Sequence, residues 1–501
     1  MLFNSYVFLA FLPVALGGFF VVAHFGRSAA ICWLILVSLL FYGWLNPAFV
    51  PLLLVSVGAN YAVARLIGAT SGRVQGWVLA GAIAANLLAL VYFKYLASLL
   101  GLLGMRFAAP VLPLGISFFT FTQIGFLIDC RQGLARERGF SSYVLFVTFF
   151  PHLIAGPILH NREIMPQLAT ASIYRVSAPN IAAGLAIFLI GLLKKCLLAD
   201  PLASTVAAGY AHPETLSLLG AWQLALAYSL QLYFDFSGYS DMAIGIARMF
   251  NVRFPANFNS PYKAQSVIEY WQRWHMTLTR YLTLYLYNPI ALWVTRRRLV
   301  RGLAVHRAAQ ATLRGFCAMV LLPTLVTVTL AGVWHGSGVT FLVFGVLHAV
   351  YLSVNHAWRL WWRGSRGTDH GAVVGRVALT YGCVLVGSVV FRAPSLWAAG
   401  QVLSGMLGSH GATVQLGDAK ESAKALLWAA WMAVLFAMVW GAPNTQQIMR
   451  LCSPTLEAVR AGPMPWLAWQ PSLRWAAAIG CAAALALLSL GGSGEFLYFQ
   501  F

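Results

Sequence analysis

The residues from Leu2 to Val22 read LFNSYVFLAFLPVALGGFFVV, a stretch without a single charged side chain. A helix needs about 20 mainly apolar residues to cross the hydrocarbon core of a bilayer. This stretch is therefore long enough to span a membrane. Comparable apolar runs recur along the whole chain: Ile31 to Leu53, Trp77 to Leu103, Ile181 to Leu193, which is shorter, and Phe316 to Ala331.

The composition agrees with this pattern. Hydrophobic residues make up 60% of the 501 residues and charged residues only 9%, against about 25% charged in an ordinary soluble domain. Some runs are too short or too broken to cross, so we expect an all-α polytopic membrane protein with about 11 spanning helices and one or two that enter and return. No polar stretch is as large as a soluble domain, and we treat residues 1–501 as a single integral membrane domain.

The net charge of +20 comes from basic residues scattered between the apolar runs. Nucleic-acid binding would need one soluble basic face, whereas cytoplasmic loops of a membrane protein carry just such an excess of positive charge. Loops around Arg27, Arg73 and Arg131 follow alternate spans, so we place them in the cytoplasm and the N-terminus outside. The first apolar run has no basic region before it, and we interpret it as a retained span, not a signal peptide.

Two further features limit the chemistry. The seven cysteines are dispersed, and no pair has the spacing of metal ligands, so neither disulfides nor a metal site is expected.

The segment FFPHLIAGPI, at Phe149 to Ile158, holds two prolines and a glycine among apolar residues. Such backbone is tolerated at membrane depth only where protein or a watery cavity surrounds it. We interpret it as a re-entrant segment that points at a cavity.

A basic segment runs from Arg296 to Arg314 and contains six arginines. Its spacing allows an amphipathic helix with Leu299, Leu303 and Ala304 turned toward lipid. Such a helix would lie on an anionic membrane surface, where each basic residue contributes about 1 kcal/mol. A plain cytoplasmic loop is an equally good interpretation.

Ionisable residues within apolar segments are costly, which makes them functional candidates. The first such cluster, QLYFDFSGYSDM, carries Asp235 and Asp241. Six helical residues turn through about 600°, so the two carboxylates would face about 120° apart and would not form a catalytic pair. We favour a structural role, with hydrogen bonds or basic partners; lining a substrate path is the alternative.

The second cluster, EYWQRWHMTLTRY, starts at Glu269. On one continuous helix Trp271, His275 and Thr279 would share a face, and Glu269 would pair with Arg273. Trp271 and Trp274 would then form an aromatic wall from which the imidazole of His275 projects. A histidine among tryptophans is more often a hydrogen-bonded structural group than a catalyst, so both interpretations stay open.

The third cluster, LAGVWHGSG, carries Trp334 and His335, and His348 follows it. Three glycines flank His335 and allow another backbone or a ligand to approach closely. Burial would keep the imidazole neutral and able to accept a proton. The alternative is a core histidine that is satisfied by a carbonyl group.

Together, and in this order along the chain, these segments resemble the signature of the membrane-bound O-acyltransferase (MBOAT) family. The resemblance covers nearly the whole chain, and two late segments are similar to its bacterial polysaccharide-acetylation branch. The segments are Pro113 to Phe118, Phe150 to Ile158, Asp235 to Asp241, Asn257 to Tyr262, Trp271 to Leu278 and Trp334 to Gly336, then Phe391 to Pro394 and Pro443 to Gln447.

The resemblance implies a ring of tilted helices around a central tunnel through the membrane. It places the family's catalytic histidine on His335 and its second functional histidine on His275. The expected candidates for the substrate tunnel are Trp271, Trp274, Trp334, His348, Asp235 and Asp241.

The alginate O-acetylation type within the family implies an O-acyltransferase in the bacterial inner membrane. It would move acetyl groups from a cytosolic thioester, acetyl-coenzyme A, to an exopolysaccharide such as alginate, beside a periplasmic acetyltransferase partner. No bound cofactor is expected. Two alternatives remain: transfer of D-alanyl or another acyl group from a carrier protein, and a transporter whose ionisable residues line a path without covalent chemistry.

Overall fold

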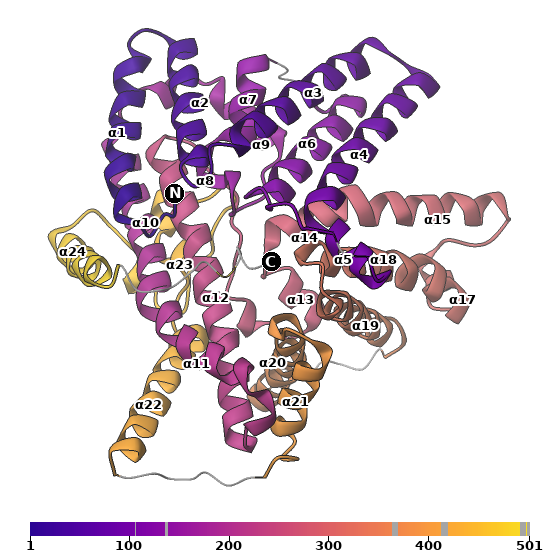
Figure 1. The fold of residues 1–501 in the computed structure, drawn as a ribbon, viewed down its shortest axis with the longest axis vertical. Coiled ribbons are helices and arrows are strands. Elements are labelled where there is room, and N and C mark those ends of the chain that lie inside the picture. Colours follow the sequence, from indigo (N-terminus) through magenta and orange to yellow (C-terminus); the bar gives the residue numbers. More distant parts are fainter. Residues whose placement is uncertain (106, 136–138, 363–368, 412–418, 491–496, 498–501) are drawn as a thin grey trace. The chain divides into compact units, whose positions relative to one another are not determined.

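The computed structural model describes residues 1–105, 107–135, 139–362, 369–411, 419–490 and 497, and every regular element in these ranges is a helix (Figure 1). They form two compact units. Unit 1 consists of Met1–Leu197, Asp235–Asn257 and Thr445–Gln500, and unit 2 includes Leu198–Phe234 and Phe258–Asn444.

Eight helices of the described ranges are long and apolar enough to cross a membrane. They are α1 (Tyr6–Ala23), α3 (Phe49–Ala69), α4 (Gly72–Lys94), the run Ala178–Ala211, the run Leu313–His335, α19 (Val339–Trp361), α20 (His370–Arg392) and Ser422–Gly441 of α22 (Ala419–Gly441). Two shorter apolar helices accompany them, α2 (Arg27–Gly43) and α24 (Leu473–Leu488). The prediction of an all-α polytopic membrane protein is confirmed, but eight helices in the described ranges, and not about 11, are long and apolar enough to span.

The apolar window from Ile31 to Leu53 is not one helix. Helix α2 ends at Gly43 and α3 begins at Phe49, with Asn46 and Pro47 between them. The Asn46 side chain accepts a hydrogen bond from the backbone N–H of Ala48 at 3.0 Å. This local bond is typical of Asn in turns, and it explains why a continuous apolar run is divided.

The irregular segment at Phe149 to Ile158 is buried inside unit 1. Helix α8 (Phe150–Leu153) is only four residues long, and the Phe150 ring packs against those of Phe8, Phe41 and Phe250. Gly115 adopts a positive φ of 71°, and a Cβ there would lie 2.6 Å from the carbonyl oxygen of Leu153. Protein thus surrounds this irregular backbone. Burial in protein is one of the two environments, beside a watery cavity, in which such backbone is tolerated at membrane depth.

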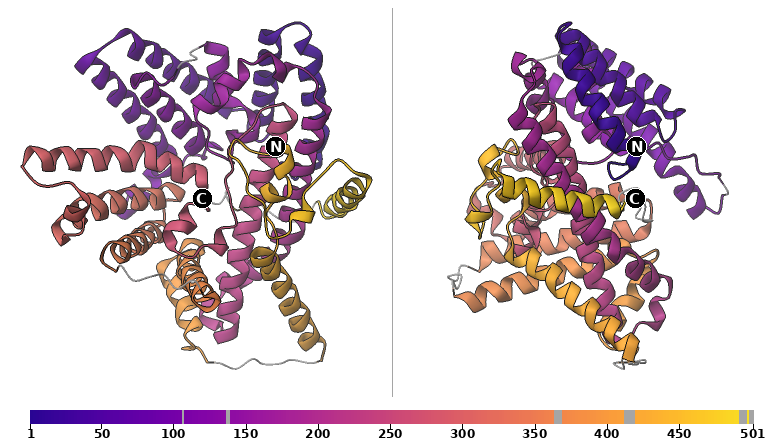
Figure 2. Two further views of the ribbon diagram at one scale, coloured as in Figure 1. Left: turned by 180° about the vertical axis from the view of Figure 1, so that it is seen from behind. Right: turned by 90° about the vertical axis from the view of Figure 1, so that its left-hand side faces the viewer.

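Two glycine pairs join α10 (Ala178–Leu193) to the second half of α12 (Leu218–Met249) in unit 1. A Cβ at Gly184 would lie 2.5 Å from the carbonyl oxygen of Gly245, and one at Gly191 would lie 2.5 Å from that of Gly238. Small residues at such a crossing allow helix backbones to approach closely, as is common between membrane helices. On the other side, α24, the yellow helix of Figure 2, packs against α10.

We expect Gly191→Val to destabilise the protein by about 1–3 kcal/mol, because the added atoms would force the two backbones apart. The measurement is thermal unfolding of the detergent-purified protein. Gly81→Val is the matched control, since Gly81 also lies inside a helix but a Cβ added there would meet no neighbouring atom within 4 Å. Equal midpoints for the two variants would contradict the glycine contact.

In unit 2, α18 (Leu322–His335) and α19 form a tightly packed pair. A Cβ at Gly332 would overlap the backbone of α19 at Phe341 and Gly345, and a Cβ at Gly336 would overlap the Phe341 ring. The glycines beside His335 therefore serve close backbone packing, and this packing fixes the end of α18 where His335 lies.

Candidate active site

The segment that carries His275 is a helix break, so the prediction of one continuous helix is wrong. Helix α13 (Val267–Trp271) ends four residues before His275, and α14 (Met276–Leu282) begins directly after it. His275 has φ 42° and ψ 52°, the left-handed conformation. Trp271, His275 and Thr279 therefore do not share a helix face. A left-handed residue other than glycine costs about 1–3 kcal/mol and persists only where the surrounding structure demands it.

Stacked aromatic rings hold one side of this break. The Trp274 indole stacks on Tyr270 at 5.7 Å between ring centroids and on Tyr262 at 6.2 Å. The Tyr262 hydroxyl in turn donates a hydrogen bond to the carbonyl oxygen of Ser229 at 2.7 Å. Trp274 thus packs in the aromatic core of unit 2 and helps to fix the backbone that precedes His275.

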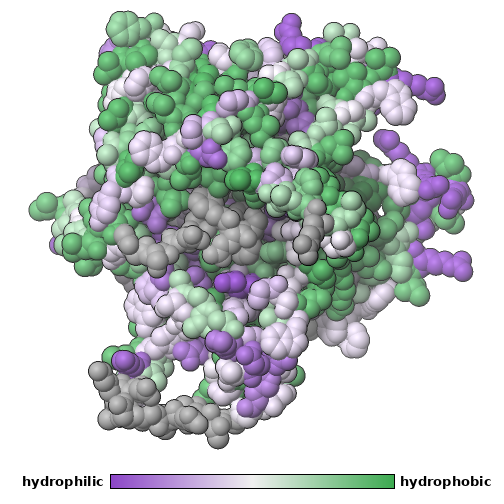
Figure 3. Space-filling model, viewed as in Figure 1, coloured by the Kyte–Doolittle hydropathy of each residue, from purple (hydrophilic) through white to green (hydrophobic). Residues whose placement is uncertain are grey.

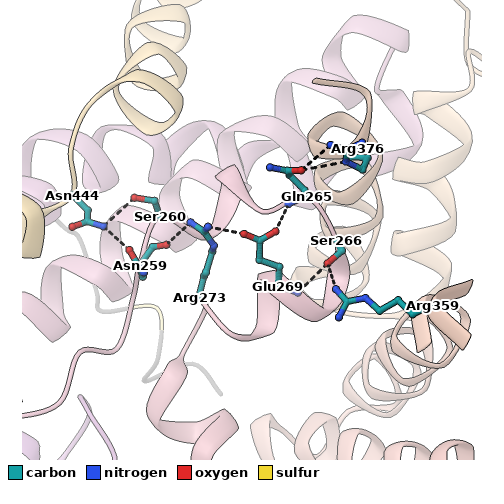
Figure 4. A network of polar contacts seen from close by, with 9 residues as sticks. All are labelled: Asn259, Ser260, Gln265, Ser266, Glu269, Arg273, Arg359, Arg376 and Asn444. Carbon is teal, nitrogen blue, oxygen red and sulfur yellow. Dashed lines mark hydrogen bonds and ion pairs between the residues drawn. The ribbon is translucent and has the colours of Figure 1, made fainter. Parts of the chain in front are cut away.

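A polar network holds the other side (Figure 4). The Arg273 guanidinium donates to Glu269 at 2.6 Å, which confirms the predicted pair, and to the carbonyl oxygen of Asn259 at 3.4 Å. The backbone N–H of Asn259 donates back to the carbonyl oxygen of Arg273 at 2.9 Å. Further hydrogen bonds connect this part of the chain to neighbouring segments of unit 2. They involve Ser260, Gln265, Ser266, Arg359, Arg376 and Asn444.

The helix break at His275 places His275 and His335 near the same tryptophan, Trp334. The ring centroid of Trp334 lies 6.4 Å from that of His275 and 4.8 Å from that of His335. His275 is buried, whereas His335, the last residue of α18, is partly exposed. The two histidines that were singled out in separate motifs therefore both lie near one indole ring.

Further aromatic rings continue from His335. Phe391 lies 5.1 Å and Phe344 6.3 Å from the His335 ring, and Phe344 lies 4.5 Å from His348. The indole N–H of Trp271 donates to Nδ1 of His348 at 3.3 Å. Trp271, Trp334 and His348, predicted as tunnel candidates, therefore belong to one aromatic cluster with the two histidines.

Sequence reasoning gave no role to Phe344 and Phe391. Phe391 lies in the Phe391 to Pro394 segment, which contributed only to the family resemblance, and that segment was the signal that could have found it. Phe344 lies one helical turn before His348, which places both on the same face of α19. Both rings make the surroundings of His335 apolar.

Burial favours a neutral imidazole at His275. His275 lies outside the eight spans, and burial lowers its pKa to about 3 because it disfavours the charged form. A neutral imidazole has one nitrogen that accepts and one that donates, so such a ring can take a proton or hydrogen-bond an oxyanion. In the described ranges no three His, Cys, Asp or Glu side chains are grouped as metal ligands would be.

Asp235 and Asp241 lie in unit 1, each with its own lysine. Lys195 Nζ lies 2.6 Å from Asp235 Oδ1, and Lys194 Nζ lies 2.6 Å from Asp241 Oδ2. Asp241 also accepts hydrogen bonds from Thr445 and Gln446, of the late Pro443 to Gln447 segment, at 2.6 and 3.0 Å. Both aspartates thus have the basic partners that the structural interpretation predicts.

We expect Arg273→Gln to lower acyl transfer by about tenfold to a hundredfold, because a misplacement of about 1 Å at a reacting group costs up to a hundredfold. The change removes the charge that joins Glu269 to the His275 segment, while Arg273→Lys should keep part of the activity. Arg314→Gln, at an exposed position, is the control for the lost charge. Full activity of Arg273→Gln would show that the network does not position His275.

The apolar helices and the paired histidines define a multi-pass membrane protein with a histidine site lined by aromatic rings. Residues 86–306 match the model of MBOAT, the membrane-bound O-acyltransferase family. A peptidoglycan O-acetyltransferase of Helicobacter pylori is 37% identical over 450 residues, which cover 83% of this chain and 81% of the relative. The chain therefore belongs to the membrane-bound O-acyltransferase family and is an O-acyltransferase.

Two other relatives show the range of the family. The probable alginate O-acetylase of Azotobacter vinelandii is 32% identical over 538 residues and aligns with all of both chains. A teichoic acid D-alanyltransferase of Bacillus subtilis is 26% identical over 249 residues, which cover 50% of this chain and 60% of the relative. The family match contains His275, and the alignment with the Azotobacter relative extends over His335 as well.

Proposed function

We propose that this protein transfers acetyl groups from acetyl-coenzyme A toward a glycan outside the bacterial inner membrane, with His335 and His275 as its catalytic residues. The observation that carries this proposal is the placement of both histidines beside Trp334 in an aromatic cluster of an O-acyltransferase. The N-terminus would lie on the periplasmic side, as the distribution of basic loops predicts.

In the proposed reaction His335 acts as general base. It takes the proton of an acceptor hydroxyl as that oxygen attacks the thioester carbonyl, and a C–O bond forms. The tetrahedral intermediate then collapses, the C–S bond breaks, and the proton passes from His335 to the departing thiolate. His275, through the nitrogen that carries its proton, would donate a hydrogen bond to the oxyanion, a contribution that often exceeds all others in acyl transfer.

The donor can be tested directly. Acetyl-coenzyme A is favoured over a carrier-bound D-alanyl group because relatives named for O-acetyl transfer align with more than four fifths of this chain and the D-alanyltransferase with half. Purified protein should release free coenzyme A from acetyl-coenzyme A in the presence of a glycan acceptor. Saturable transfer from an acyl carrier protein, with none from acetyl-coenzyme A, would reverse this choice.

The proposed acceptor is an exopolysaccharide such as alginate, from the likeness to the alginate O-acetylases. Peptidoglycan is the second candidate, because the Helicobacter relative is named for it. In the described ranges most of the chain lies in helices joined by short segments, and a groove for a long polymer would therefore be supplied by a periplasmic acetyltransferase partner.

Deletion of the gene, followed by measurement of ester-linked acetate on both polymers, separates these acceptors. Loss from the secreted polysaccharide alone supports the first, and loss from peptidoglycan alone supports the second. Unchanged acetate on both polymers, with acyl groups lost from a lipid or a protein, would overturn the glycan assignment.

A further inference from the structure

A compact arginine-rich hairpin in unit 2 has no role in the proposed reaction. This arginine hairpin comprises residues 288–316: α15 (Asn288–Val300), a turn, α16 (Arg307–Gln310) and α17 (Leu313–Phe316). The structure therefore differs from the single amphipathic helix that the spacing of the basic segment allowed. The break falls at Gly302, whose φ is 67°, and Arg298 closes the turn by donating to the carbonyl oxygen of Ala304 at 2.9 and 3.2 Å.

The hairpin is folded and attached to the rest of unit 2. Val294 of α15, Ala309 of α16 and Met319 form a small buried cluster between its arms. The Trp361 indole N–H, at the end of the spanning helix α19, donates to the carbonyl oxygen of Ala311 at 2.7 Å. The hairpin is thus held beside one end of a membrane span.

Tryptophans at this end of α19 indicate the membrane–water interface. Trp358 and Trp362 are exposed and stack in parallel at 4.7 Å between ring centroids. Exposed tryptophans are enriched where spanning helices leave the hydrocarbon. Because Trp361 bonds to Ala311, the hairpin is held at this same end of α19.

The exposed face of α15 mixes apolar and cationic side chains. It presents Leu292, Trp293, Leu299 and Val300, the last 88% exposed, together with Arg296. The Arg297 guanidinium lies 5.0 Å from the centre of the Trp293 ring. Helix α15 is the last part of a continuous helical run that begins at Met276, and this run is not among the eight spans. A helix that mixes exposed apolar and cationic side chains in this way is expected to lie in the membrane interface.

The charge of the region is entirely positive. No acidic residue occurs in the sequence between Glu269 and Asp369, and none of the ion pairs found in the described ranges involves Arg296, Arg301 or Arg307. In Figure 3 hydrophilic side chains project where α15 and α17 lie, with hydrophobic ones between them. A soluble acidic partner would suit the arginines but would leave the interleaved aliphatic side chains without lipid.

We propose that the arginine hairpin lies in the membrane surface and binds the phosphate groups of anionic phospholipids. The guanidinium groups of Arg296, Arg301 and Arg307 would meet the phosphates, and Leu299 and Val300 would enter the acyl-chain boundary. This proposal does not depend on the acyl-transfer reaction.

The first test measures lipid preference. The full-length protein in detergent is titrated with phosphatidylglycerol or phosphatidylcholine, and bound lipid is counted by native mass spectrometry. The triple variant Arg296→Gln, Arg301→Gln, Arg307→Gln should bind phosphatidylglycerol at least about tenfold more weakly, while the triple Arg→Lys variant at these positions keeps most of the preference. An unchanged preference in the Gln variant, or an equal loss in the Lys variant, would overturn the proposal.

The second test locates the α15 face and is independent of charge. Val300→Cys, with the exposed Cys32, Cys317 and Cys481 changed to serine, is labelled with a fluorophore in nanodiscs of equal parts phosphatidylcholine and phosphatidylglycerol. Lipids with brominated acyl chains should quench the label, and iodide in the water should not. Quenching by iodide alone would show that the face is in water and available to a soluble acidic protein.

Competition separates a lipid headgroup from a free anion. Inorganic phosphate and acetyl-coenzyme A are each added to the protein with bound phosphatidylglycerol. Retention of the lipid supports the proposal, whereas its displacement by either soluble anion at equimolar concentration would assign the arginines to a soluble phosphate ligand.

Discussion

Replacement of His335 with alanine should abolish acyl transfer while the protein stays folded in the membrane. Positioned proton transfer by a side chain contributes about 10²- to 10⁴-fold to a rate, and the variant loses the only group proposed to take the acceptor proton. Because His335 is partly exposed at the end of α18, its removal should leave the helix packing around Gly332 and Gly345 intact. Transfer is measured as ester-linked acetate on the glycans of cells that carry the variant in place of the unaltered protein.

His370→Ala is the matched control, because His370 is exposed at the start of α20 and does not contact the aromatic cluster. Its activity should equal that of the unaltered protein. Near-normal transfer by His335→Ala would remove His335 from the mechanism. An acetyl group trapped on the protein at His335 would keep the residue but replace proton transfer by covalent catalysis.

The second large effect concerns stability and the buried pair in unit 1. Asp235→Leu should destabilise the protein by about 3–5 kcal/mol, because it leaves the ammonium group of Lys195 buried without its carboxylate. The two side chains are 2% and 3% exposed. Unfolding is followed by circular dichroism in detergent over a denaturant series.

The double variant Asp235→Leu, Lys195→Met should recover most of this loss, since two apolar side chains leave no buried charge. Glu214→Gln is the control: it removes one partner of an exposed pair with His212 and should change stability by less than about 1 kcal/mol. If the double variant were no more stable than the single one, the loss of the Asp235 carboxylate beside Lys195 would not be the cause.

The spans could be predicted from the sequence because each is a local property of a continuous apolar run. The residues at which the spans begin and end were harder to predict, as the division between Gly43 and Phe49 shows. There a single asparagine bond and a proline outweigh the apolar pattern. The turn at Gly302 within the arginine hairpin is a second example. There a short local turn ends a helix that the spacing of the basic segment would allow to continue.

The sequence predicted which residues belong to the site but not how they are arranged in space. The cost of an ionisable group in an apolar segment identified His275 and His335, because that argument needs only their positions in the sequence. Trp334 was a candidate through the family resemblance. The left-handed backbone of His275 could not be predicted, since stacking of Trp274 on Tyr262 and Tyr270 helps to hold it and these contacts exist only in the folded chain.

Asp235 and Asp241 show what could be predicted from the sequence and what could not. Helical geometry indicated that Asp235 and Asp241 would not form a catalytic pair, and they bond to different lysines. The identity of those lysines depends on how α10 crosses α12 at Gly191 and Gly238, which is a matter of tertiary packing.

The most direct test of the central claim uses purified protein in liposomes with acetyl-coenzyme A labelled in its acetyl group and an oligosaccharide acceptor. Our account predicts equal amounts of free coenzyme A and labelled ester from the unaltered protein, and neither product from His335→Ala. Passage of a labelled compound across the membrane with its thioester intact, and no ester formed, would contradict it.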